Sequence, residues 1–97
     1  MMKLGKDAAL AVLSLADAEG AAPEGGLRVD ALRGSNDDDE IEISTSVAAM
    51  SSETDTVVTD EDTGARVFLD QASADVVGDR TLEVRRSDGD TVDFVLR

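Results

Sequence analysis

The second half of the sequence contains two pairs of short β-branched segments, and a turn signal separates the two segments of each pair. Segments 55–59 and 65–69 flank DEDTG, whose Gly64 can adopt a positive φ angle. Segments 81–86 and 91–96 flank SDGD, in which Asp88-Gly89 is a strong signal for a two-residue turn. Each pair predicts an antiparallel hairpin. The last hairpin is expected to share one buried face, formed by Leu82, Val84, Val92, Phe94 and Leu96.

The beginning of the chain predicts an amphipathic helix over Lys6–Glu19. Its apolar residues recur at helical spacing, and Gly20 stands where a helix commonly ends. The stripe consists of Ala9, Val12, Leu13 and Ala16, widened by Leu10 and Leu15. The following AAPEGG is a connector, because proline and glycine cannot readily continue the helix.

Between the helix and the hairpins, residues 27–32 and 41–44 alternate in polarity and predict two strands, with a short strand over 47–50. Asp70 can cap a short helix over 71–77 that Gly78 ends. This order of elements predicts an α+β fold, with mixed, mostly antiparallel sheets and helices packed to one side. At 97 residues, we expect one domain spanning 1–97.

Composition excludes several kinds of site. The chain has no cysteine and no histidine, so disulfides, thiolate metal sites and histidine bases are unavailable, and any metal must have oxygen ligands. The net charge of −13 disfavours nucleic acid and anionic lipid surfaces. With no apolar run long enough to span a membrane and no signal peptide, we expect a cytoplasmic protein.

Four stretches, taken in order, cover most of the chain: DAALAVLSLADAEG, GGLRVDALRGS, DTVVTDEDTGARVFLD and DQASADVVGDRTLEV. Together they resemble the HesB/IscA family, the A-type carriers of iron–sulfur cluster assembly. The resemblance implies the family fold, with an N-terminal helix and a short second helix. It also implies a homodimer or a protein partner, since family carriers commonly form dimers.

The resemblance fails at the family's metal ligands. It implies a cysteine after the Gly-rich turn, but that position falls on or next to Asn36. It also implies a C-terminal Cys-x-Cys pair, and the chain stops at Arg97 without an equivalent. No ligand residue carries over, so we predict no cofactor and assign no catalytic, cofactor-binding or metal-binding residue.

The acidic run 36–40 has two interpretations. Asn36, Asp37, Asp38, Asp39 and Glu40 could bind a divalent cation such as calcium or manganese. The calcium-loop pattern fails, however, because Ile41 replaces its glycine. A solvated turn whose like charges discourage strand pairing is favoured.

Two further sets of charged residues have a structural interpretation as well as a functional one. Asp60, Glu61, Asp62 and Asp70 could be cation ligands, but a hairpin turn explains the sequence fully. Arg28, Arg33, Arg85 and Arg86 could bind an anion or a partner, whereas charge-neutralising pairs suit so acidic a chain better.

The expected function is a non-enzymatic, HesB/IscA-like domain that acts through protein–protein interaction or in an accessory role. The alternative is a divalent-cation-binding module that uses the turn 36–40. Catalysis is disfavoured because no histidine base is available and the many carboxylates single out no acid–base pair. A further possibility is that the acidity is an adaptation to salt.

Overall fold

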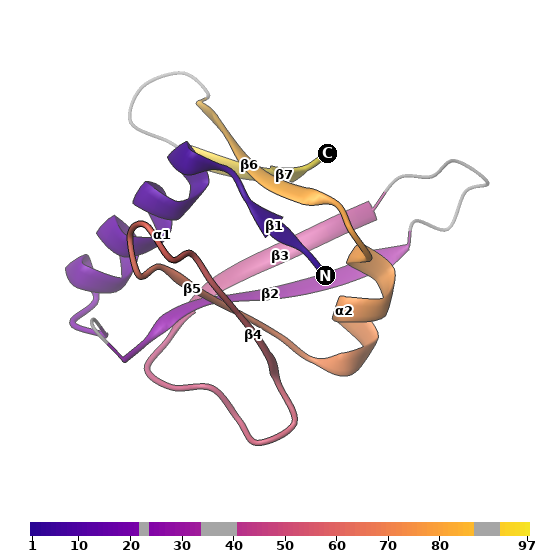
Figure 1. Ribbon diagram of the computed structural model, residues 1–97, viewed down its shortest axis with the longest axis horizontal. Helices are drawn as coiled ribbons and strands as arrows, with labels where there is room; N and C mark the ends of the chain where they lie inside the picture. Colours follow the sequence, from indigo (N-terminus) through magenta and orange to yellow (C-terminus); the bar gives the residue numbers. More distant parts are fainter. Residues whose placement is uncertain (22–23, 34–40, 87–91) are drawn as a thin grey trace.

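The computed structural model describes residues 1–21, 24–33, 41–86 and 92–97 (Figure 1). In this part of the chain, two helices accompany two sheets with strand orders β1-β6-β7 and β3-β2-β5-β4. The elements are β1 (Lys3–Leu4), α1 (Lys6–Ala18), β2 (Gly26–Arg33), β3 (Ile41–Ala48), β4 (Thr56–Thr59), β5 (Arg66–Leu69), α2 (Gln71–Val77), β6 (Thr81–Arg86) and β7 (Val92–Leu96). The predicted α+β class, with mixed and mostly antiparallel sheets, is confirmed.

Helix α1 forms where the apolar spacing predicts it and ends before Gly20, which has φ of 72°. It contacts both sheets: β6 of the three-stranded sheet, and β2, β5 and β3 of the four-stranded sheet. Its buried face consists of Ala8, Ala9, Val12 and Ala16. The predicted widening of the buried stripe by Leu10 and Leu15 is wrong, because these residues are 48% and 38% exposed. Small alanines instead face the sheets, which lets the helix backbone approach them closely.

The alternation of apolar and polar side chains along β2 determines which face of the four-stranded sheet is buried. Leu27, Val29 and Ala31 face the core and are nearly inaccessible to solvent. Strand β3 pairs antiparallel with all eight residues of β2, from Gly26 opposite Ala48 to Arg33 opposite Ile41. The prediction of a separate strand over 47–50 is therefore wrong, because this continuous ladder carries β3 through to Ala48.

Both later hairpins form as predicted. β4 pairs antiparallel with β5, and Gly64 between them has φ of 81°. β6 pairs antiparallel with β7, with Leu82 opposite Leu96 and Val84 opposite Phe94. The predicted Asp88-Gly89 turn and the side chain of Val92 lie outside the described residues.

Two parallel pairings hold distant segments together, and the sequence does not predict either. β2 pairs with β5 through Leu27 opposite Val67, and β1 pairs with β6 through Leu4 opposite Leu82. The first contact is close at Gly26, where an added Cβ would lie 2.2 Å from the Arg66 carbonyl oxygen. Gly26 therefore lets β2 run beside β5 without a steric clash.

Helix α2 covers β2 beyond its pairing with β5. Asp70 caps the helix as predicted, because its carboxylate accepts a 2.7 Å hydrogen bond from the Ser73 amide, and Gly78 follows with φ of 60°. The Ser73 hydroxyl, 3% exposed, accepts a 3.0 Å bond from the Ala31 amide. The side chain thus satisfies a backbone donor of β2 that β5 does not reach.

Both sheets and both helices contribute to one apolar cluster. It includes Met2, Ala8, Ala9, Val12, Leu27, Val29, Ala31, Val58, Ala65, Val67, Leu69, Val77 and Leu82. The predicted buried face of the last hairpin joins it through Leu82, while Val84, Phe94 and Leu96 are partly buried against it. Phe68 is also buried, but it lies on the opposite side of β5, in register with Arg28 and Val57.

Candidate functional site

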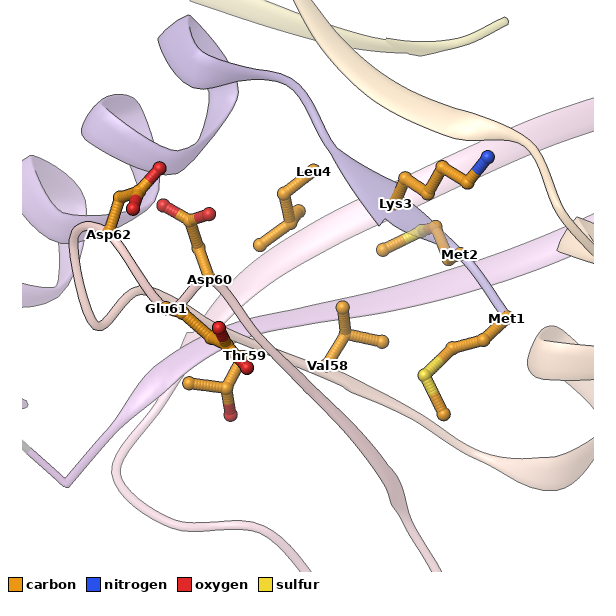
Figure 2. A pocket seen from close by; sticks show the side chains of 9 residues that line it. All are labelled: Met1, Met2, Lys3, Leu4, Val58, Thr59, Asp60, Glu61 and Asp62. Carbon is orange, nitrogen blue, oxygen red and sulfur yellow. The ribbon is translucent and has the colours of Figure 1, made fainter.

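Two grooves lie at the sides where the edges of the sheets approach one another. The first, here called the β1/β4 groove, has a volume of about 410 Å³ and lies between one edge strand of each sheet (Figure 2). Its lining residues are Met1, Met2, Lys3, Leu4, Val58, Thr59, Asp60, Glu61 and Asp62. These residues come from the start of the chain, from β4 and from the turn that joins β4 to β5, so only the folded chain brings them together.

The β1/β4 groove has an apolar side and an acidic end. Met2 and Val58 are buried, and Leu4 is partly buried against the core. Figure 2 shows Asp60 and Asp62 at the end of the groove near Leu4, with Met1 at the other end and the Lys3 side chain directed away from the acidic turn. The groove therefore suits an elongated molecule with apolar groups along its length and a cation at one end.

The acidic turn beside this groove is a hairpin turn, as predicted. The Asp60 carboxylate accepts hydrogen bonds from the Thr63 hydroxyl at 2.6 Å and the Thr63 amide at 3.2 Å. The Asp60 carbonyl accepts from the Gly64 amide at 2.7 Å. Glu61 and Asp62 are exposed and form no ion pair with any described residue. Their carboxylates can therefore meet an incoming cation without breaking an internal bond.

The second groove, here called the β3/β7 groove, lies between the other edge strand of each sheet and measures about 550 Å³. It is lined by Ile41, Glu42, Ile43, Arg80, Arg85, Phe94, Val95 and Leu96. The Arg80 guanidinium donates to the carbonyls of Val76 and Val77, so it already caps the end of α2. Arg85 is exposed at this groove.

The predicted charge-neutralising role is confirmed for one arginine. The Arg28 guanidinium forms an ion pair with Asp55, whose side chain is 1% exposed. The Ser52 amide also donates to this carboxylate at 2.8 Å. The Ser52 amide, followed by the Arg28 guanidinium, lowers the pKa of Asp55, while burial acts in the opposite direction. The side chains of Arg33 and Arg86 lie outside the described residues.

The structure does not bring the predicted oxygen ligands together where it describes them. Asp70 caps α2 and Asp60 holds its own turn, so these two carboxylates have separate structural roles. In the described ranges, no group of three or more acidic side chains is placed to hold a metal ion. The acidic run, Asn36 to Glu40, lies outside those ranges. Within them, no helix is long and apolar enough to cross a membrane.

Comparison with known proteins identifies the fold. No protein-family model matches the sequence, and no curated protein does. The structure is similar to the crystal structure of Escherichia coli SufA, a protein involved in biosynthesis of iron–sulfur clusters. The match covers 99% of this chain and 78% of the SufA chain, with a TM-score of 0.75. The chain has the SufA fold. At 12% sequence identity the likeness is one of backbone architecture, and it confirms the HesB/IscA-like fold that the sequence predicts.

The residues of β1 are those that the sequence did not reveal. Met2 and Leu4 contribute to the groove because Lys3 and Leu4 pair with Thr81 and Leu82 in the SufA-like fold. A strand of two residues shows no alternation that could distinguish it from a disordered end.

Proposed function

We propose that the chain is a single, non-enzymatic, cytoplasmic domain that binds another protein or its own copy without holding an iron–sulfur cluster. The observation that carries this proposal is a SufA-like fold on a chain of 97 residues without cysteine or histidine. The likeness of the fold supports an accessory role in iron–sulfur cluster assembly.

Ligand chemistry supports the loss of cluster binding. Iron–sulfur clusters are held by soft thiolates, with imidazole as the less common nitrogen ligand. This chain supplies carboxylates in their place, and carboxylates prefer hard cations such as magnesium, calcium or manganese.

The surfaces that remain support protein binding. Both grooves have apolar walls and lie at sheet edges, where backbone groups are available to another chain. Divalent-cation binding by the turn 36–40 stays an alternative prediction, and no observation in the described residues favours it over protein binding.

Anaerobic reconstitution with ferrous iron and sulfide tests the loss of cluster binding. After desalting, we expect the protein to retain iron and sulfide far below one cluster per chain and to show no charge-transfer absorbance. A cysteine-ligated ferredoxin treated in parallel is the positive control. A stable, stoichiometric cluster on this chain would overturn the proposal.

A further inference from the structure

We propose that the β1/β4 groove binds an extended peptide segment of a partner protein, with apolar side chains along the groove and a lysine or arginine beside Asp60, Glu61 and Asp62. This inference rests on the proposed protein-binding function and specifies the chemistry of the partner. The peptide is expected to add as a strand to the edge of β4.

The backbone of β4 offers hydrogen bonds on its free side. The Asp60 amide donates to the Ala65 carbonyl at 2.8 Å, which continues the β4–β5 ladder by one residue. Along an antiparallel strand, the backbone amide and carbonyl groups of successive residues point to alternate sides. Those of Thr56 and Val58 therefore also point toward β5. Val57 and Thr59 consequently direct their amide and carbonyl groups to the side where no described strand pairs with β4.

The edge of β1 is open in the same way. The amides of Lys3 and Gly5 donate to the carbonyls of Arg80 and Leu82, at 3.0 and 2.9 Å. The amide of Leu4, between them, therefore points away from β6. β1 has no second strand neighbour among the described residues, so the groove lies between two open strand edges. Such edges are templates for an added chain.

Side-chain chemistry selects the residues of the peptide. Leu4 and the Met1 side chain, which belongs to a residue 73% exposed, are available to cover apolar groups on one face of an extended peptide. Methionine is unbranched and adapts to different apolar shapes. At the other end, the exposed carboxylates of Glu61 and Asp62 favour a cation, because they have no ion-pair partner within the described structure.

Charge also argues against two other occupants. An acidic peptide would meet the carboxylates of the turn as well as the net charge of −13. A second copy of the chain would bring the same net charge, so self-association through this groove is opposed at low salt. A basic, apolar peptide is attracted at long range and also matches the groove on contact.

Fluorescence anisotropy with the labelled peptide KVTVTVR tests the proposal on the full chain. We expect saturable binding, at least about tenfold tighter than that of the control peptide EVTVTVE. Replacing Glu61→Gln and Asp62→Asn together should weaken binding about fivefold, a loss typical of two exposed ion pairs. The matched control, Asp17→Asn with Glu19→Gln, removes two exposed carboxylates at the end of α1 and should change affinity less than about twofold.

A second measurement tests the strand pairing. Thr59→Pro removes an outward amide and should weaken binding at least about tenfold, whereas Thr59→Ala keeps the amide and should bind within about twofold of the original chain. If Thr59→Pro unfolds the protein, N-methylation of alternate amides in KVTVTVR must produce the same loss, because it blocks the same hydrogen bonds from the peptide side.

Several results would overturn the inference. These are equal binding of the two peptides, affinity unchanged by the Glu61 and Asp62 substitutions, or no binding at all. Light scattering that finds a dimer of the original chain and a folded monomer for Thr59→Pro would assign the groove to a second copy instead. None of these results depends on cluster reconstitution, so the inference and the proposed loss of cluster binding can fail separately.

Discussion

Asp55 shows how one carboxylate fixes a long connection in this fold. Residues 49–55 join β3 to β4, which are the two outer strands of the four-stranded sheet. Asp55 ends this connection with its side chain buried. Its carboxylate accepts from the Ser52 amide and pairs with Arg28 on the inner strand β2. The Arg28 side chain is 28% exposed, so water reaches the guanidinium partner but hardly reaches the carboxylate. The loop is thereby attached to the sheet that it crosses.

Replacing Asp55→Asn should destabilise the protein at neutral pH and make the loss depend on pH. The pKa of Asp55 in the folded protein lies below its ordinary value of 3.8, so the unfolded state takes up a proton first as pH falls. Its contribution is therefore present at neutral pH and decreases as pH falls through about 4 and below the folded-state pKa. Urea unfolding at several pH values between about 7 and 3 should show the two proteins converging in stability.

The matched control is Asp17→Asn, which removes an exposed carboxylate at the end of α1. We expect it to stay close to the original chain at neutral pH. A stability difference between Asp55→Asn and the original chain that is the same at every pH would show that the charge of Asp55 is not what stabilises the loop.

Among the elements, the local ones were predictable and the long-range ones were not. Helix α2 could be placed from its cap Asp70 and its terminator Gly78, because capping and termination depend on neighbouring residues. The parallel pairings of β2 with β5 and of β1 with β6 join segments distant in sequence, so no local pattern specifies them. Ser73 illustrates this limit: its sequence position indicates a helix, but its bond to the Ala31 amide depends on how α2 lies on β2.

Replacing Ser73→Ala should therefore cost about 1–3 kcal/mol, the penalty for leaving a buried donor without an acceptor. The helix itself should form as before, since alanine favours helix more than serine does. Urea unfolding measures the loss, and hydrogen exchange should show faster exchange at the Ala31 amide. Ser51→Ala, in the exposed loop after β3, is the control and should be nearly neutral. An unchanged exchange rate at Ala31 would show that this amide does not depend on Ser73.

At the scale of the whole molecule, the fold and the candidate site were predictable to different degrees. The four matched stretches anticipate the SufA-like architecture, because each contains one or two elements whose local pattern is strong. The β1/β4 groove depends on the edges of two sheets and on a strand of two residues, which only the assembled fold defines. The predicted acidic turn 36–40 lies outside the described residues, so its role stays a prediction.

The net charge of −13 should make stability and peptide binding respond to salt in opposite directions. Raising NaCl from about 0.1 to 1 M shortens the Debye length from about 10 to 3 Å, which weakens repulsion among the carboxylates. We expect stability to rise by about 1 kcal/mol, corresponding to a Tm increase of about 4–8 °C for a domain of this size. The same screening should weaken binding of KVTVTVR, because attraction to Glu61 and Asp62 is lost.

Thermal unfolding and anisotropy in the same NaCl series measure both effects, with sucrose as a control that stabilises without screening. A Tm that does not rise with NaCl would show that self-repulsion is not limiting and would remove the basis for interpreting the acidity as adaptation to salt.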